Sequence, residues 1–217
     1  LPFVPPEGLL GVTEFLKSRV ALPFTGSYAE FRHTIRHELV HVFQLSSLTL
    51  TLTLYPRQRH AQLPLWWQEG LAEYFSAGED TRDEMILRDL AVGGRLPSIQ
   101  QLQYASGGIV YPIGGTLVRF LAGRYGDWRV LQVFDDLWKY PDFDALLVGV
   151  FGRTLEQLTA EWQLAMRRRY YGSVSEQEPL EVSATQLAAF AIKPAVWMPP
   201  GDSVPEVLYL SPRTGYT

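Results

Sequence analysis

Two histidines one helical turn apart, with a glutamate between them, constrain this chain more than any other feature. The segment reads His37-Glu38-Leu39-Val40-His41, and the chain contains only 4 histidines in all. On an α-helix, side chains at i and i+4 lie on one face, about 6 Å apart along the axis. Both imidazoles can therefore reach one tetrahedral ion, and Glu38 points to the open side of that ion.

The residues around this pair predict a helix. Positions 28–44 contain neither Pro nor Gly, and their apolar residues recur at near-helical spacing, so one face can be buried. Ser27 is a suitable N-cap, and Glu30 completes a capping-box pattern. An HExxH pattern on a helix is typical of zinc-dependent peptidases. The competing interpretation is that both histidines are core residues that hydrogen-bond backbone carbonyls.

A catalytic zinc site needs a third protein ligand besides two histidines. The next candidate is Glu69, in the segment Trp66-Trp67-Gln68-Glu69-Gly70-Leu71-Ala72-Glu73-Tyr74, where a loop is expected to enter a second helix. Here the chain resembles the gluzincin zinc metallopeptidases, above all the peptidase MA-like group and the related zinc aminopeptidases, whose second helix carries W-x-x-E-G-x-A. The resemblance implies that His37, His41 and Glu69 bind Zn²⁺ and that Glu38 is the general base.

Two other zinc-peptidase patterns do not fit. A metzincin would need Gly at position 44 and His at position 47, where this chain has Gln44 and Ser47, and the Gly-Thr-x-x-Asp element of the aspzincins is absent. His60 is an alternative third ligand, although it lies in a polar segment typical of a solvated loop. His33 would lie about 12 Å along the helix axis from His41, so we assign it a supporting or structural role.

Two further residues are candidates for roles in the site. Glu73 shares the helical face of Glu69 and can accept the second ring N–H of His37, an interaction that fixes the tautomer of a zinc-bound histidine. The alternative is an exposed helix glutamate. Tyr111 lies in a Y-x-x-G segment that looks like one in the zinc aminopeptidases, and the resemblance implies that its phenol stabilises the oxyanion of the tetrahedral intermediate. The alternative is that Tyr111 simply begins a helix.

The chain also departs from the aminopeptidases. The G-x-M-E-N element with which they capture the substrate amino terminus is missing from residues 1–36, so endopeptidase action is the expectation. The interval between His41 and Glu69 is longer than is usual in that group. Within it, residues 48–54 alternate Leu and Thr, a period-two pattern that suggests a strand or a wall of the cleft, or else prolongs the first helix.

We expect two regions in the chain. Residues 1–172 form the metallopeptidase domain, which is mostly helical and has a short edge strand at 18–23 beside the first helix. Residues 173–217 form a linker and a β-rich tail, whose short apolar pieces and Pro/Gly turns resemble the start of a propeller blade. The expected fold class is α+β, mostly helical. The chain would then be the front part of an exported peptidase with a C-terminal propeller.

Composition narrows the classes of function. The 217 residues are 47% hydrophobic and carry a net charge of −4, which allows a real core and argues against nucleic-acid binding. The absence of cysteine excludes disulfides and thiolate ligands. No apolar run in the sequence is long enough to span a bilayer, and no signal sequence is recognisable. A periplasmic or secreted bacterial location is implied by the resemblance alone.

Two functions are consistent with these observations. The first is zinc-dependent hydrolysis of peptide or protein substrates, with water activated by the metal and Glu38. The second is a non-catalytic zinc-binding scaffold or peptide-binding domain attached to a propeller. A structural zinc site prefers a closed fourth position and needs no base, so the sequence favours the enzyme.

Overall fold

The computed structural model describes residues 12–14, 19–24, 26–56, 62–76, 81–174, 196–197 and 208–209. The chain divides into two compact units, Leu1–Val174 and Ser175–Thr217. In the second unit, strands β3 (Val196–Trp197) and β4 (Leu208–Tyr209) pair antiparallel. The rest of the expected β-rich tail, including the beginning of a propeller, lies outside the described residues.

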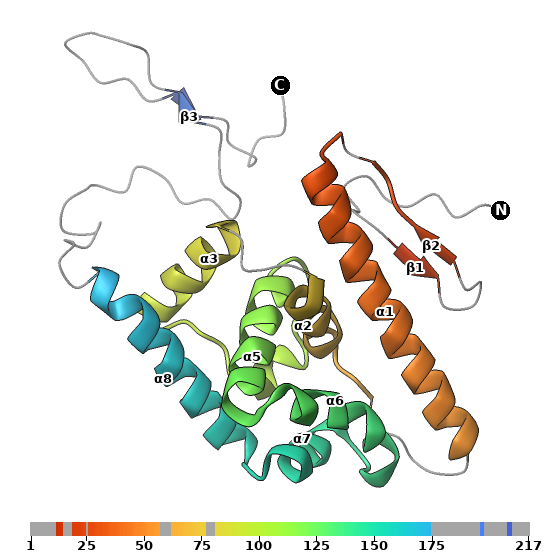
Figure 1. Cartoon of the computed structure of the whole chain (residues 1–217). Helices are drawn as coiled ribbons and strands as arrows, with labels where there is room; N and C mark the ends of the chain where they lie inside the picture. The colour runs from red at the N-terminus through yellow and green to blue at the C-terminus, as the bar shows by residue number, and fades with distance from the viewer. Residues whose placement is uncertain are drawn as a thin grey trace, which may run out of the picture. The chain divides into compact units, whose positions relative to one another are not determined.

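The first unit is mostly helical, as predicted (Figure 1). Strands β1 (Val12–Glu14) and β2 (Arg19–Ala21) pair antiparallel before the first helix. The helices are α1 (Tyr28–Leu54), α2 (Leu65–Ser76), α3 (Thr81–Val92), α4 (Ile99–Leu102), α5 (Val110–Tyr125), α6 (Asp127–Asp135), α7 (Phe143–Phe151) and α8 (Leu155–Val174), with a 3-10 turn at Leu137–Lys139. None of the helices in these described ranges combines the length and the hydrophobicity that a bilayer crossing requires.

Helix α1 extends further than the pattern around the histidines indicates. Ser27 caps it by accepting a hydrogen bond from the backbone N–H of Glu30, as expected. The helix then continues through the Leu/Thr segment to Leu54, so the strand interpretation of residues 48–54 is wrong and the prolonged first helix is correct. The hydroxyls of Thr49 and Thr53 donate to backbone carbonyls one turn earlier, which satisfies these polar groups inside the helix.

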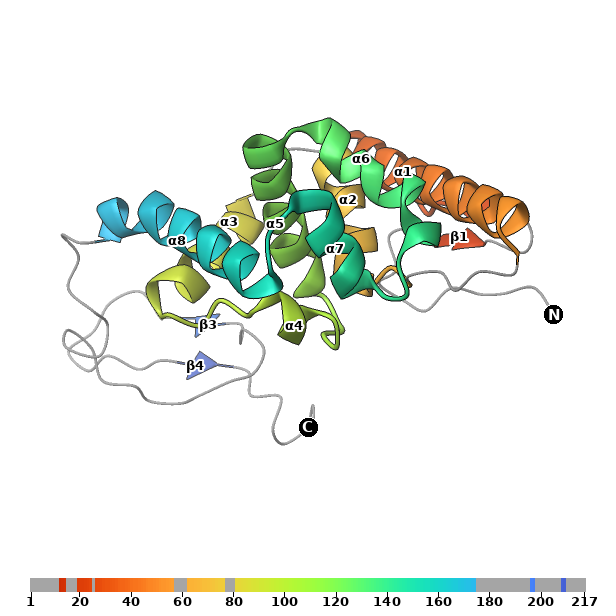
Figure 2. The ribbon, with the colours of Figure 1, turned by 90° about the horizontal axis from the view of Figure 1, so that it is seen from below.

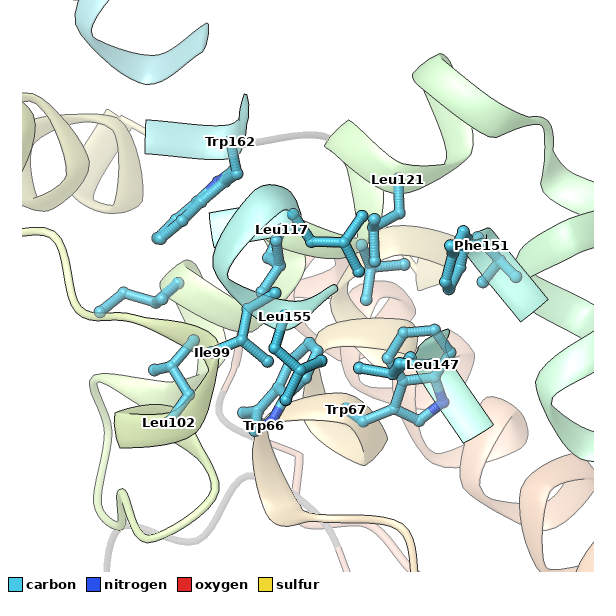
Figure 3. Close-up of a cluster of buried hydrophobic side chains, with 14 of the residues drawn as sticks. Trp66, Trp67, Ile99, Leu102, Leu117, Leu121, Leu147, Phe151, Leu155 and Trp162 are labelled. Carbon is cyan, nitrogen blue, oxygen red and sulfur yellow. The ribbon is translucent and has the colours of Figure 1, made fainter. Parts of the chain in front are cut away.

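The core of this unit forms where α2, α5 and α8 come together, and it contains large aromatic residues (Figure 3). Trp66 and Trp67, at the start of α2, are both 0% exposed, and each meets Phe143 edge-on. Since Glu69 lies about 200° around the helix from Trp67, burial of Trp67 turns Glu69 away from the core. Burial of Trp67 therefore helps to set the direction in which α2 presents Glu69.

Helices α2 and α5 cross at very close range, with α1 and α8 on opposite sides of α5 (Figure 1, Figure 2). A Cβ atom on Gly70 would lie 2.5 Å from the carbonyl carbon of Gly114, far inside van der Waals contact. A Cβ atom on Gly115 would lie 3.0 Å from the Cβ of Glu73. Only glycine at this crossing allows the two backbones to approach, and the approach carries the start of α5 toward the glutamates of α2.

Candidate metal centre

Three potential ligand atoms converge between α1 and α2. His37 Nε2 lies 3.1 Å from Glu69 Oε2, and His41 Nε2 lies 3.1 Å from His37 Nε2 and 3.3 Å from Glu69 Oε2. Within the described residues, these side chains are one of two groups with the geometry to hold a metal ion. The structure thus brings together the three residues expected as ligands from the sequence.

The spacing of these atoms fits a small tetrahedral cation. With metal–ligand bonds of about 2.0–2.2 Å and tetrahedral angles, neighbouring ligand atoms are about 3.3–3.6 Å apart. The observed edges of 3.1, 3.1 and 3.3 Å are close to this range. Small side-chain shifts are therefore sufficient to admit an ion. Imidazole and carboxylate together suit zinc and several other divalent ions.

Glu73 orients His37. Its Oε1 lies 3.0 Å from His37 Nδ1, and because a carboxylate can only accept a hydrogen bond, Nδ1 must carry the proton. In the neutral imidazole, which metal binding requires, the lone pair of His37 then resides on Nε2, which faces His41 and Glu69. Glu73 thus lies where the sequence analysis placed it, and the alternative of an exposed glutamate does not describe it, because its side chain is only 17% exposed.

His41 is oriented by Gln44, a residue to which the sequence analysis gave no role. Gln44 Nε2 donates to the backbone carbonyl of Gln68 at 2.8 Å, which leaves Gln44 Oε1 facing His41 Nδ1 at 3.0 Å. An amide oxygen only accepts, so His41 Nδ1 carries the proton and its lone pair resides on Nε2. In the sequence, Gln44 served only to exclude the metzincin pattern, which has Gly at this position. Nothing in the sequence indicated that Gln44 would bind the Gln68 carbonyl.

The resulting centre has a strong preference for positive charge. Burial alone lowers the pKa of His37, but hydrogen bonds to Glu69 and Glu73 raise it to about 9. Burial alone raises the pKa of Glu69, but hydrogen bonds from His37 and His41 lower it to about 2. Two imidazole lone pairs and a carboxylate that face one point repel one another unless a cation lies among them. Either a proton or a metal ion satisfies this arrangement.

Glu38 follows His37 in α1 and belongs to neither of the two potential ligand groups. It is buried, with 6% of its surface exposed, and Thr13 Oγ1 donates to its Oε2 at 2.5 Å. Thr13 belongs to β1, so the short strand pair contacts α1 at the histidine motif. Nothing in the sequence pointed to Thr13, because its contact with Glu38 joins residues far apart in the chain.

Tyr111 lies over His37, with ring centroids 5.9 Å apart and 27° between the ring planes. It is also the second residue of α5, so it begins a helix, as the alternative interpretation expected. Burial and then the negative charges of Glu69, Glu73 and Glu38 raise the pKa of Tyr111. Its phenol therefore remains protonated at neutral pH and can donate a hydrogen bond.

The sequence also offered His60 and His33 as histidines near the site. His60, the alternative third ligand, lies outside the described residues. His33 belongs with His37 and Glu73 to the second potential ligand group. Its Nε2 lies 3.8 Å from Glu73 Oε1, the same oxygen that is 3.0 Å from His37 Nδ1. One carboxylate oxygen of Glu73 thus lies near both histidines. This position agrees with a supporting role for His33.

The metal-free and metal-loaded forms are expected to respond to pH in opposite directions. The pKa of His37 is about 9 in the folded metal-free protein and about 6.5 when unfolded. Its contribution to stability is therefore fully present below about pH 6.5 and is lost as pH rises through about 9. Metal binding needs neutral imidazoles, so stabilisation by the ion should grow over the same interval. Thermal unfolding from pH 6 to 9, with EDTA or with excess zinc, measures both trends, and parallel curves would contradict this description.

The chain was compared with known protein families, with curated proteins and with solved structures. None of these comparisons returned a match. The resemblance to gluzincins therefore stays a prediction, and the interpretation of the centre depends on its own residues and geometry.

Proposed function

We propose that this chain is a zinc-dependent peptidase of the gluzincin type that hydrolyses internal peptide bonds. The observation that carries the proposal is the convergence of His37 Nε2, His41 Nε2 and Glu69 Oε2 within 3.3 Å of one another. Two imidazoles and one carboxylate form a ligand set used by catalytic zinc, which leaves the fourth position to water or substrate. Glu38, next to the first ligand, supplies the base that such chemistry needs.

The other residues of the site have roles that their surroundings support. When bound, Zn²⁺ supplies a Lewis acid that polarises water and the scissile carbonyl. Glu38 accepts the proton of the attacking water and passes it to the leaving amine, while Thr13 holds the Glu38 carboxylate in position. Tyr111 stays protonated because of its raised pKa and donates a hydrogen bond to the oxyanion.

The scaffold function makes different demands on the same residues. A scaffold would use the ligands and the residues that orient them, Glu73 and Gln44, but it would have no use for a base or for a phenol beside the ligands. A buried carboxylate held by Thr13 and outside the ligand group is better explained by proton transfer. The enzyme is therefore the function that the geometry supports best.

Glu38→Gln tests the proposal. Glutamine has nearly the same shape and can still accept a hydrogen bond from Thr13, but it cannot take a proton from water. The variant should keep its metal and lose about 100- to 10,000-fold in kcat on a library of quenched peptides. Wild-type cleavage should disappear with EDTA and return with zinc.

The control is Glu156→Gln, which removes a carboxylate at the start of α8 and should leave metal content and turnover unchanged. Unaltered turnover by Glu38→Gln would contradict the proposed role of Glu38 as the base. Tight metal binding by a wild type that cleaves no peptide would support the scaffold instead.

A further inference from the structure

An apolar cavity of about 530 Å³ lies next to the metal centre. Its apolar lining consists of Leu45, Leu48 and Leu52 from α1 together with Leu63 from the segment that leads into α2. The proposed reaction assigns no task to this cavity. The Leu/Thr segment, which contributes two of these leucines, is the one for which the sequence suggested a strand or a wall of the cleft.

The cavity lies on the ligand-bearing stripe of α1. Leu45, Leu48 and Leu52 occupy positions i+4, i+7 and i+11 relative to His41, so they lie within about 40° of His41 around the helix and about one to three turns further along. The cavity therefore continues the metal centre along α1, beyond His41 in the direction of the helix C-terminus.

Glutamines separate the cavity from the metal ligands. Gln44 and Gln68, which also line the cavity, belong to the hydrogen-bond chain that orients His41. The side-chain amide of Gln68 donates to the backbone carbonyl of Leu63 at 2.8 Å, so this wall is held in place. One side chain, Gln44, thus touches both the ligand His41 and the cavity.

The chemistry of the lining selects the occupant. The described residues that line the cavity are leucines and glutamines, and none of them is charged. A charged group that entered would lose its hydration and find no partner of opposite charge, which is costly. A large aliphatic or aromatic group would instead remove apolar surface from water on both sides.

We propose that this cavity is the subsite that receives a large apolar side chain of the peptide, of the size of Leu or Phe, close to the scissile bond. This inference rests on the proposed peptidase function and adds the class of substrate. It also gives a role to two leucines of the Leu/Thr segment: Leu48 and Leu52 line the cavity, with Leu52 still 44% exposed, whereas Leu50 and Leu54 do not line it and are 58% and 61% exposed.

The first arm of the test compares quenched peptides that differ at one position, Phe, Ala or Asp, near the cleaved bond. The wild type should prefer Phe over Asp by about 10- to 200-fold in kcat/KM. Leu48→Trp fills the cavity and should lower cleavage of the Phe peptide at least about tenfold while sparing the Ala peptide. The milder Leu52→Phe should act in the same direction. Leu50→Trp, the same exchange as Leu48→Trp on the exposed side of α1, should leave both peptides unaffected.

The second arm does not depend on turnover. Fluorescence anisotropy measures binding of the labelled peptides to zinc-loaded Glu38→Gln protein, with and without Leu48→Trp. Tighter binding of the Phe peptide, lost on filling the cavity, supports the subsite even if the wild type cleaves nothing. Equal binding of the three peptides, or a preference for Phe that survives both cavity variants, overturns the subsite. Zinc-reversible cleavage by the wild type would then still support the peptidase.

Discussion

Glu69→Ala is expected to leave the protein unable to retain its metal ion. Glu69 Oε2 lies 3.1 Å from His37 Nε2 and 3.3 Å from His41 Nε2, and it is the anionic member of the ligand set. Without it, two neutral imidazoles remain, fewer than the three protein ligands on which catalytic zinc sites depend. Zinc content after gel filtration, together with competition against a chelator of known affinity, measures the loss. Peptide cleavage should disappear with the metal.

Glu73→Ala and Gln44→Leu are the matched comparison. Both keep the three ligands and remove the acceptor for the second N–H of one imidazole, His37 or His41. Metal affinity should fall by about 10- to 100-fold, the usual cost of losing such an orienting partner. Glu73→Gln should recover much of the affinity, since its amide oxygen still accepts from His37 Nδ1.

The opposite order of metal loss in the Glu69 and Glu73 variants would identify a different metal centre. If Glu73→Ala lost the ion while Glu69→Ala kept it, the metal would belong to the group formed by His33, His37 and Glu73.

Gly114→Ala is expected to destabilise the whole helical unit. The added Cβ would collide with the backbone oxygen of Trp66, and the partner glycine, Gly70, already lies against Gly114 from the other helix. Neither neighbour is the end of a flexible side chain, so α2 and α5 must separate. We expect a loss of about 2 kcal/mol or more, within the range for overpacked cores, which corresponds to a fall in Tm of about 4–8 °C.

Gly123→Ala is the control within the same helix. A Cβ at this position meets none of the described atoms within 4 Å, and alanine is favoured over glycine in a helix interior by about 1 kcal/mol. This variant should therefore be slightly more stable than the wild type, whereas Gly114→Ala is less stable. Urea unfolding of both measures the difference. Equal stability of the two variants would show that the α2–α5 crossing tolerates a methyl group.

The helical content of the chain could be predicted because it depends on local properties. Near-helical spacing, the Ser27 cap and the absence of Pro or Gly between 28 and 44 act within a turn or two of the chain. The strand interpretation of the Leu/Thr segment was wrong because leucine and threonine alternate along the sequence with a period of two, whereas the segment belongs to a helix. In α1, Leu48 and Leu52 line the cavity, although Leu52 is 44% exposed, and Leu50 and Leu54 lie on the opposite side of the helix.

Part of the metal centre could likewise be predicted from local sequence, and part depended on the packing of the helices. The pairing of His37 with His41 follows from their spacing alone, because helix geometry places i and i+4 on one face. The approach of Glu69 depends on where the buried tryptophans and the Gly70–Gly114 contact place α2. A resemblance suggested Glu69, but local sequence could not bring it within 3.3 Å of both imidazoles.

The sequence by itself determined the ligand types, the register of the histidine pair on its helix and the mostly helical character of the first unit. Only the tertiary structure decided the tautomers of both imidazoles, the contact between Thr13 and Glu38, and the cavity beside Gln44. The physical reason is the separation along the chain of the residues that interact. Helix periodicity is written into residues a few positions apart, whereas a hydrogen bond to the Gln68 carbonyl exists only once two helices have packed.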